Sequence, residues 1–456
     1  MRVRNPRTGV YDYEIPDCTA AQILNCCKQL RNHQDAWVRS GITNRIAVLQ
    51  EWKQSIIVNK ELLIGALAAD TGRTWESTAE VNWVIDSIDK WCATTKDFYE
   101  EYANWIPYQL IGVISPWNFP LALSMMDTIP ALLSGASVLV KPSEITPRFI
   151  EVMNRTILAV PGLQKMLLFT PGDASVGATM VDQVDLVCFT GSVNTGKKIA
   201  LAASKKLTPV LMEIGAKDPA IVLQGANVEV AATAILKGST TNAGQNCLSF
   251  ERVYVHESIH DDLVDLLIEK TKAIQLVADD QHKGEIGPII FEKQVLTINT
   301  HLEDAKDLGA IILTGSESCE QIHGGFYCRP TIVVNVTHNM LLMKEETFGP
   351  IMPIMSFSST EEAVELANAT KYSLGAAVFA ATNEEAEDIA NRIHAGSISI
   401  NESALTAILH YGDNLSFNMS GIGGLRIGQE NFSRFLKKRT IHLLKNEWKN
   451  TSLLTP

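Results

Sequence analysis

The sequence predicts an α/β protein made of two units, each built on a mostly parallel sheet, with a helical segment ahead of them. Three observations lead to this prediction. After residue 110 short apolar runs alternate with helix-like stretches, the alternation resumes near residue 217, and residues 19–100 carry helical periodicity instead. Strands separated by helices of about 10–15 residues indicate βαβ units and a parallel sheet. A chain of 456 residues also exceeds one usual hydrophobic core, so two or three domains are expected.

Residues 19–100 are predicted to be helical because apolar residues recur there at three- and four-residue spacing. The pattern indicates helices over 20–36 and 42–67, and a third around 81–91. Little room then remains before residue 111 for more than a brief connection.

The first α/β unit follows. Short apolar runs predict strands at 110–114, 136–140, 166–169, 185–189 and 210–214. Helical stretches between them lie at 125–133, 150–159, 175–181 and from 196 to about 206. Ligands bind outside the carboxyl ends of parallel strands. We therefore expect a binding site among the loops 115–120, 141–146, 171–177 and 190–196.

The second unit is expected from residue 217 to about 400. Its strand candidates are 219–223, 252–256, 310–314, 331–336, 376–380 and 397–401. A last short strand is predicted in the tail, at 440–444.

Composition and charge exclude several classes of function. The formal net charge is −12, and so acidic a surface repels nucleic acid and anionic membranes. No apolar run approaches the ~20 residues needed to span a bilayer, and the N-terminus lacks the apolar stretch of a signal peptide. The eight cysteines have neither a disulfide-framework nor a zinc-ligand spacing. We therefore expect reduced thiols, no metal, no integral membrane segment and a cytoplasmic location.

The segment Gly191–Lys197 fits the start of a phosphate-binding P-loop. A P-loop needs Ser or Thr next to bind magnesium, whereas this chain has Lys198, which argues against a nucleotide triphosphatase. The strand before it and the helix after it still form a helix N-terminus that can hold the pyrophosphate of a dinucleotide. A plain strand-to-helix turn explains the glycines equally well.

Two further loops at predicted strand ends carry polar candidates. In Ser115–Pro120, two prolines stiffen the loop, and the amide of Asn118 could donate to a developing alkoxide or simply cap its own turn. In Lys141–Glu144, the lysine could bind a ribose hydroxyl or a phosphate. Glu144 could accept from a ribose 2′-hydroxyl and would repel a 2′-phosphate, which favours NAD over NADP. Plain surface charge is the alternative for this loop.

The later candidates for chemistry are two carboxylates, a thiol and an aromatic ring. Glu213 lies in an apolar strand, where burial would raise its pKa toward that of a general base unless it pairs with nearby Lys217. Cys247 follows a glycine-containing turn and is either a nucleophile or a small buried hydrophobe, which is the interpretation for the other seven cysteines. Glu346 could bind ribose hydroxyls and Phe348 could pack on a nicotinamide, although spacing alone indicates only a polar loop.

Each motif is weak by itself, but their order is specific. PWNFP, KPSE, FTGS, LMEIGAKDP, GQNC and EETFGP follow one another at intervals that resemble the aldehyde dehydrogenase superfamily, over nearly the whole chain. Several stretches resemble the long-chain and apocarotenal aldehyde dehydrogenases of bacteria. These stretches are 5–9 (NPRTG), 113–133, 187–196, 399–407 and 417–424 (FNMSGIGG).

The resemblance implies a role for each matching residue. Cys247 matches the nucleophile, Asn118 matches the oxyanion donor that acts with the backbone N–H of Cys247, and Glu213 matches the base that activates the hydrolytic water. The cofactor is expected to be NAD, with NADP as the alternative. Its implied contacts are Ile114, Ser115, Pro116, Trp117, Lys141, Ser143, Glu144, Gly172, Thr190, Gly191, Ser192, Gly215, Glu346 and Phe348.

The resemblance also implies a domain plan: a Rossmann-like cofactor domain, a second α/β catalytic domain and a small oligomerisation element. We expect the NAD-binding domain at 1–97 and 109–215 and the catalytic domain at 216–410. The oligomerisation element would comprise 98–108 and 438–456, and its shortness favours a homodimer over a tetramer. Ala216 departs from the family pattern, which has a second glycine there, and this places the position of Glu213 in question.

The expected substrate is an aldehyde, long or apolar as the resemblance suggests, such as an apocarotenal or a fatty aldehyde. An apolar lining could come from side chains that could equally be core: Phe119, Met125, Phe250, Tyr411 and Phe417. Two other functions remain open: a CoA-acylating dehydrogenase, which would not need Glu213, and a catalytically silent binding protein of the same fold.

Overall fold

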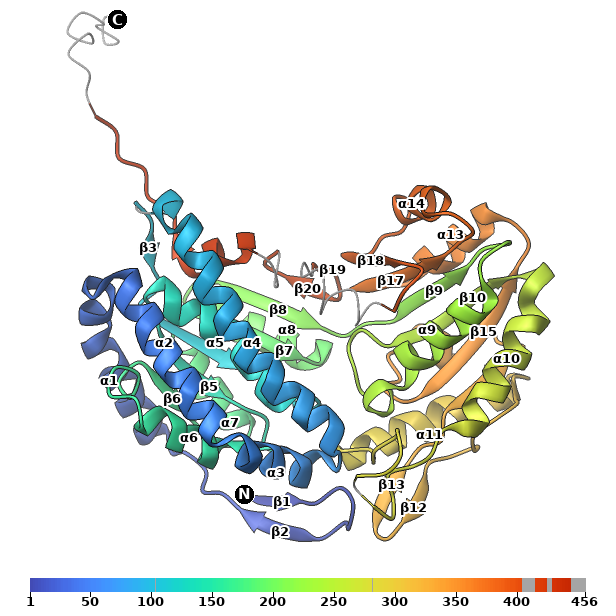
Figure 1. The fold of residues 1–456 in the computed structure, drawn as a ribbon, viewed down its shortest axis with the longest axis horizontal. Helices are drawn as coiled ribbons and strands as arrows, with labels where there is room; N and C mark the ends of the chain where they lie inside the picture. The colour runs from blue at the N-terminus through green and yellow to red at the C-terminus, as the bar shows by residue number, and fades with distance from the viewer. Residues whose placement is uncertain (103, 281, 404–414, 425–428, 444–456) are drawn as a thin grey trace, which may run out of the picture.

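The computed structural model describes residues 1–456 apart from 103, 281, 404–414, 425–428 and 444–456. Two α/β units lie side by side and together form a concave molecule (Figure 1). Strand β8 of the first unit leads into β9 of the second unit near the middle of the molecule. The first unit has a six-stranded sheet in the order β20-β8-β7-β4-β5-β6, and the second a seven-stranded sheet in the order β11-β14-β15-β10-β9-β17-β18. The predicted α/β class with two parallel sheets is confirmed.

The first sheet contains all five strands predicted for it. They are β4 (Leu110–Ile114), β5 (Ser137–Lys141), β6 (Leu167–Phe169), β7 (Leu186–Gly191) and β8 (Val210–Ile214), all parallel. The short β20 (Gly421–Ile422) pairs antiparallel with β8. The connecting helices are α5 (Pro120–Ser134), α6 (Phe149–Leu158), α7 (Ala174–Val181) and α8 (Val193–Ser204).

Both faces of this sheet are buried, which is why its strands read as continuous apolar runs. Alternate residues of β4 enter two different cores. Ile111 and Val113 face the core beneath the N-terminal helices. Leu110 and Ile114 face a second core on the opposite side of the sheet. Burial on both faces thus removes the alternation of polar and apolar residues and leaves a strong strand signal.

The N-terminal helices are α1 (Ala20–Arg39), α2 (Gly41–Val58), α3 (Lys60–Thr71) and α4 (Thr74–Phe98). The single helix predicted over 42–67 is wrong, because the chain breaks at Asn59, whose side chain donates to the carbonyl of Ser55. Such local hydrogen bonds of Asn compete with helix continuation. The structure also has an N-terminal hairpin that the sequence did not predict, β1 (Arg2–Arg4) with β2 (Tyr11–Glu14).

The second sheet consists of β9 (Asp218–Val222), β10 (Phe250–His256), β11 (Ile311–Ile312), β14 (Thr331–Val334), β15 (Ile351–Phe357), β17 (Gly375–Phe379) and β18 (Ser397–Ile400). Only β11 is antiparallel among these. The helices of this unit are α9 (Val228–Thr240), α10 (His260–Ala273), α11 (Glu292–Asp307), α12 (Leu341–Lys344), α13 (Thr360–Asn368) and α14 (Asn383–Ala390). The interior strand β15 was not predicted, and it contains Pro353, which is unusual within an interior strand.

The tail differs from its prediction. Residues 440–443 form no strand, and the end of the predicted strand lies outside the described residues. Instead β21 (Leu436–Lys437) pairs antiparallel with β3 (Ile106–Pro107), and the chain then leaves the body (Figure 1). The remaining short elements are β12 (Glu320–Ile322), β13 (Gly325–Tyr327), β16 (Tyr372–Ser373), β19 (Phe417–Asn418), η1 (Tyr99–Tyr102), η2 (Thr241–Gly244), η3 (Glu257–Ile259) and η4 (Gln429–Phe435). Within the described part of the chain, no helix is long and apolar enough to cross a membrane.

Candidate active site

The loop that carries Cys247 begins with an unusual left-handed turn. Asn242, Ala243 and Gly244 have φ angles of 58°, 55° and 70° in succession. A side chain at Gly244 is excluded, because a Cβ there would lie 2.2 Å from the backbone of Gly349. Non-glycine residues at positive φ cost energy and persist only where their surroundings hold them. The structure around the turn must therefore supply that support.

Gln245 supplies much of it. Its side chain is fully buried, and its amide nitrogen donates to the carbonyls of Asn242 (2.9 Å) and Pro288 (3.1 Å). Its amide oxygen accepts from the backbone N–H of Ile290 at 2.8 Å. Both ends of this amide are thus used, so the turn before Cys247 is held in one conformation.

The thiol of Cys247 contacts the carboxylate of Glu213. Sγ donates to Oε1 of Glu213 over 3.4 Å. Burial, reinforced by the charge of Glu213, raises the pKa of Cys247 well above its ordinary value. The alternative expected for Glu213, a pair with Lys217, is wrong, because Lys217 Nζ instead lies 2.6 Å from Glu251 Oε2. The arrangement is a protonated thiol beside a carboxylate that can accept its proton.

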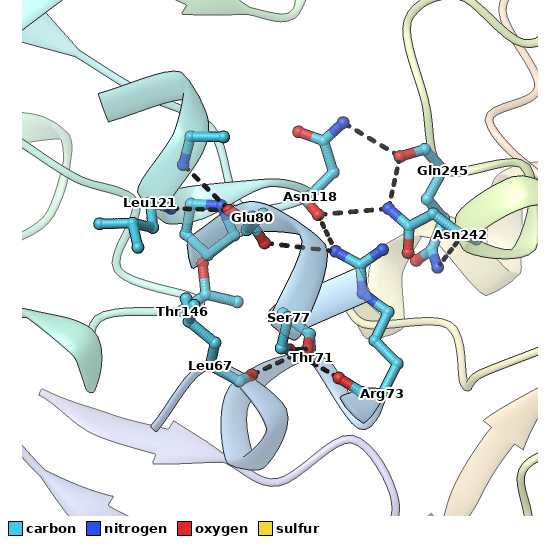
Figure 2. Close-up of polar contacts among 12 residues, drawn as sticks. Leu67, Thr71, Arg73, Ser77, Glu80, Asn118, Leu121, Thr146, Asn242 and Gln245 are labelled. Atoms are coloured by element: carbon cyan, nitrogen blue, oxygen red, sulfur yellow. Dashed lines mark hydrogen bonds and ion pairs between the residues drawn. The ribbon is translucent and has the colours of Figure 1, made fainter. Parts of the chain in front are cut away.

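Asn118 reaches the same loop from the first unit (Figure 2). Its side-chain nitrogen donates to the carbonyl of Gln245 at 3.0 Å, across 127 residues of sequence. Its own carbonyl accepts from the side chain of Asn242 at 3.2 Å. The alternative in which Asn118 caps its own turn is therefore not what forms. The amide predicted as an oxyanion donor and the predicted nucleophile belong to one hydrogen-bonded assembly.

The predicted cofactor residues of the first unit gather at the carboxyl ends of its parallel strands, as expected. In register, Ile114 at the end of β4 lies beside Lys141 of β5 and Phe189 of β7. Lys141 Nζ forms an ion pair with Glu144 Oε2 at 2.9 Å. The lysine is buried, whereas 42% of the Glu144 side chain stays exposed. A partly exposed carboxylate that is anchored by a buried cation can accept hydrogen bonds from the hydroxyl groups of a ligand.

The turn between β7 and α8 combines a helix N-terminus with one unpaired hydroxyl group. The hydroxyl of Ser192 caps α8 by accepting from the N–H of Thr195 at 3.4 Å. Thr190 lies opposite Glu213 in the β7–β8 pairing, and its buried hydroxyl has no hydrogen-bond partner among the described residues. A helix N-terminus with a neighbouring unused hydroxyl fits the phosphates of a dinucleotide.

The other predicted residues of this unit follow the same edge. Ser115 is buried and its hydroxyl contacts that of Ser124 at 2.7 Å. Pro116 and Ser143 lie in the loops after β4 and β5, Gly172 lies between β6 and α7, Gly191 ends β7 and Gly215 follows β8.

The second unit contributes Glu346 and Phe348. The rings of Phe348 and Trp117 meet edge to face with centroids 5.5 Å apart, so the two units contact each other here. Glu346 Oε1 accepts from the backbone N–H of Ala216 at 2.8 Å. Burial raises the pKa of Glu346 to about 8. Ala216 is accommodated beside Glu213, which still reaches the thiol, so the departure from the glycine pattern leaves the base in place.

The expected apolar lining is only partly present. Met125 and Phe250 are fully buried in two separate hydrophobic cores, so for these two residues the core alternative is the one that the structure supports. A sequence cannot separate a core methionine or phenylalanine from one that lines a site. Phe119 is half-buried, Phe417 is exposed, and Tyr411 lies outside the described residues.

Three site-supporting residues were missed: Arg73, Gln245 and Glu251. Each is a charged or polar residue that is no more than 3% exposed to solvent. Gln245 lies two residues before the predicted nucleophile. Arg73 and Glu251 contact loops that are distant in sequence, so no local pattern indicated these two residues. No group of three potential metal ligands exists within the described ranges.

The chain is similar to known proteins over nearly its whole length. The profile described as "Aldehyde dehydrogenase family" matches residues 1–441. A protein of Mycolicibacterium smegmatis named "putative succinate-semialdehyde dehydrogenase", with NADP(+) in its name, is 32% identical over 447 residues, which are 94% of this chain and 85% of the relative. The solved structure of a "putative aldehyde dehydrogenase PutA" from Anabaena variabilis is 46% identical, with a TM-score of 0.93 and 96% of both chains covered. Betaine aldehyde dehydrogenase from Staphylococcus aureus, solved in complex with NAD+, is 26% identical with a TM-score of 0.89, over 99% of this chain and 93% of that one.

Proposed function

The chain belongs to the aldehyde dehydrogenase family, and from that premise we propose that it oxidises an aldehyde to the carboxylic acid through a covalent adduct on Cys247. One observation carries the proposal. The thiol lies 3.4 Å from the carboxylate of Glu213, and the amide of Asn118 is bonded to the same loop. A nucleophile, a base and an oxyanion donor thus converge, which is the set that covalent oxidation of a carbonyl needs.

The proposed chemistry begins with the proton of the Cys247 thiol, which Glu213 accepts. The thiolate adds to the aldehyde carbon, and the carbonyl oxygen takes up the charge. A primary amide has two N–H groups, so Asn118 can donate to this oxygen while still bonded to Gln245. Each such donor lowers the activation barrier by about 3–4 kcal/mol. A bound nicotinamide supplies the acceptor for the hydride that leaves the tetrahedral carbon. Glu213 must first release the thiol proton to solvent. Its carboxylate then removes a proton from the water that hydrolyses the resulting thioester, and the leaving thiolate of Cys247 takes that proton up.

We further propose that NAD or NADP binds along the carboxyl ends of β4, β5, β7 and β8, with Phe348 and Glu346 closing the nicotinamide end. The free hydroxyl of Thr190 and the N-terminus of α8 support this placement. Glu144 favours NAD, because a 2′-phosphate would meet its carboxylate. Comparing kcat/KM for NAD and NADP in the wild type and in Glu144→Gln tests this. A variant that gains NADP activity supports the role of Glu144, and an unchanged ratio contradicts it.

For the substrate, we propose the long or apolar aldehydes suggested by the stretches at 113–133 and 417–424. Phe119, adjacent to Asn118, is the apolar side chain that supports this class. The relatives are named for succinate semialdehyde and betaine aldehyde, which are small and polar. A panel of short polar, aromatic and long-chain aldehydes compared by kcat/KM decides. A preference for the short polar members would replace the substrate proposal and leave the chemistry standing.

We propose domains at 1–97 with 109–215 for the cofactor and 216–410 for catalysis, and a homodimer formed through 98–108 and 438–456. Ile441 and Leu443 are 62% and 85% exposed in the tail that leaves the β3–β21 pair, which suits burial against a second copy. Sedimentation of the wild type and of an Ile441→Ser/Leu443→Ser variant tests the dimer. A variant that stays dimeric contradicts a role for these two side chains.

The nucleophile is tested by Cys247→Ala, with Cys319→Ala as the control at another half-buried thiol. Aldehyde-dependent NADH formation should fall by at least about 10³-fold in the first variant and persist in the second. Full activity in Cys247→Ala would overturn the proposal. Acyl-CoA as a product would convert the assignment to a CoA-acylating enzyme, and cofactor binding without turnover on any aldehyde would identify a silent member of the fold.

The base is tested separately by Glu213→Gln. Loss of the carboxylate should slow thioester hydrolysis, so that one equivalent of NADH forms in a burst before slow turnover. Because Glu213 raises the pKa of Cys247, the same change should lower that pKa and accelerate alkylation by iodoacetamide at pH 8. Slow turnover combined with faster alkylation separates a lost base from a damaged site, in which both reactions would slow.

A further inference from the structure

Arg73 is a buried arginine that reaches the site from the helical segment. It precedes the first residue of α4, and its side chain is 2% exposed. One guanidinium nitrogen donates to the backbone carbonyl of Asn118 (Figure 2). The guanidinium also lies over the ring of Phe119, 4.7 Å from its centroid. Asn118 and Phe119, two consecutive residues of the Ser115–Pro120 loop, are therefore held by one side chain.

Glu80, two turns further along α4, holds the residues that follow this loop, at the beginning of α5. One of its carboxylate oxygens accepts from the backbone N–H groups of Leu121 and Ala122, both at 3.0 Å. The other lies 3.8 Å from the guanidinium of Arg73. These N–H groups belong to the first turn of α5, where a carboxylate is favoured. Together, Arg73 and Glu80 contact four of the five residues from Asn118 to Ala122.

The cost of this arrangement indicates a function. Two nitrogens of Arg73 and one oxygen of Glu80 have no hydrogen-bond partner among the described residues. A buried ion pair so incompletely satisfied contributes little to folding, and apolar replacements of such pairs are often neutral or stabilising. What the pair does provide is a defined position for the carbonyl of Asn118, and therefore for the side chain that leaves the same backbone.

We propose that Arg73, supported by Glu80, is a positioning residue that holds Asn118 where its amide can donate to the oxyanion. The proposal rests on the function proposed above for Asn118. Catalytic geometry must hold to about 0.5 Å, and a displacement of about 1 Å costs on the order of 100-fold in rate. Without Arg73, the side chain of Asn242 is the one remaining donor to the carbonyl of Asn118 among the residues that the structure describes. The loop then gains the freedom to move by such a distance.

The experiment is a double-mutant cycle of Arg73→Met and Asn118→Ala, measured as kcat/KM for the aldehyde at saturating cofactor. Asn118→Ala removes the amide and leaves the backbone carbonyl that Arg73 contacts. If Arg73 acts through Asn118, Arg73→Met lowers kcat/KM by about 10- to 100-fold alone and causes no further loss beside Asn118→Ala. Cofactor KM should stay unchanged in Arg73→Met.

Arg45 provides the matched control. It is an equally buried arginine that donates to the carbonyl of Leu133 at 2.9 Å, at the opposite end of α5. Arg45→Met should lower the melting temperature, and whatever loss of kcat/KM it causes should multiply with that of Asn118→Ala. Arg73→Lys keeps the charge and one donor, so its kcat/KM should lie between wild type and Arg73→Met. It also serves as the second variant should Arg73→Met fail to fold.

The outcomes separate this proposal from the one on which it rests. Asn118→Ala with full activity would overturn the oxyanion role itself, and the role of Arg73 with it. A large loss in Asn118→Ala, combined with a multiplicative loss in the double variant, would overturn only the role of Arg73. Unchanged kcat/KM in Arg73→Met would overturn it as well. A large loss in each single variant, with no further loss in the double variant, supports both.

Discussion

Two buried ion pairs hold the two walls of the site, and they differ in how completely they are satisfied. In the second unit, Lys217 Nζ lies 2.6 Å from Glu251 and also donates to the hydroxyl of Thr347 at 3.1 Å. The two carboxylate oxygens of Glu251 accept from the backbone N–H groups of Thr347 and Phe348, both at 2.7 Å. At the other wall, the Arg73–Glu80 pair of the helical segment spans 3.8 Å and leaves three polar atoms without a hydrogen bond to any described residue.

The difference separates two uses of buried charge. The Lys217–Glu251 pair builds the loop that carries Glu346 and Phe348, since it supplies acceptors for that loop's backbone. Phe348 has a φ of 53°, a conformation that needs such support. The Arg73–Glu80 pair instead holds the carbonyl of Asn118 and two N–H groups in the first turn of α5, at the connection that carries the proposed oxyanion donor. We therefore expect the first pair to govern stability and cofactor binding, and the second to govern the reaction.

The largest expected effect is on stability. Lys217→Met leaves Glu251 buried without its cation, and breaking a buried pair in this way costs about 3–5 kcal/mol of unfolding free energy. Arg73→Met should cost no more than about 3 kcal/mol, because Glu80, whose pKa burial raises to about 7, can take up a proton once its cation is gone. Urea denaturation at pH 7 measures both. An equal or larger loss in Arg73→Met would remove the distinction between the pairs.

A smaller effect is expected on the KM for the cofactor, with little change in the KM for the aldehyde. Glu251→Gln keeps the size of the side chain but has only one acceptor for two backbone N–H groups, so the 346–348 loop should loosen. We expect cofactor KM to rise by about 10-fold, corresponding to about 1.4 kcal/mol, with aldehyde KM nearly unchanged. Initial rates with each substrate varied in turn check this. A variant that loses kcat with unchanged cofactor KM would place Glu251 with Arg73 instead.

The same comparison shows what the sequence could predict of the fold. Strands β4 and β5 were predicted because burial on both faces makes them continuously apolar. Strand β15 was missed although its first four residues are buried, and the proline within it, Pro353, is unusual for an interior strand. The break at Asn59 was missed because a single asparagine lowers helix propensity only slightly. What ends the helix there is the hydrogen bond from its side chain to the carbonyl of Ser55. These failures come from single residues whose effect depends on their neighbours in space.

The candidate site divides in a similar way. Cys247, Glu213 and Asn118 were predicted from the order of motifs, and the structure brings them together. The partner of Lys217 was not predictable, because Glu213 is four residues away, whereas the actual partner, Glu251, is 34 residues away and is brought near only by the fold. Arg73 lies 45 residues from Asn118, in the short connection between α3 and α4. Only the packing of α4 against α5 shows that this charge faces inward, so residues that act through others are the part that motifs leave out.

The smallest effect concerns pH and tests whether the looser pair is the one that titrates. Burial raises the pKa of Glu80 from 4.5 to about 7, although Arg73 opposes the rise. Between these pH values the folded chain holds a proton that the unfolded chain has lost. Stability from this group is therefore full below pH 4.5 and is lost as the pH rises through about 7. Glu80→Gln has no such proton, so its unfolding free energy relative to wild type should improve by up to about 1.4 kcal/mol per pH unit from pH 5 to 7, then level off. Urea denaturation at pH 5, 6, 7 and 8 measures the slope, with Asp97→Asn, an exposed carboxylate on the same helix, as the control. A flat difference between Glu80→Gln and wild type would mean that Glu80 stays ionised, and that Arg73 satisfies it as fully as Lys217 satisfies Glu251.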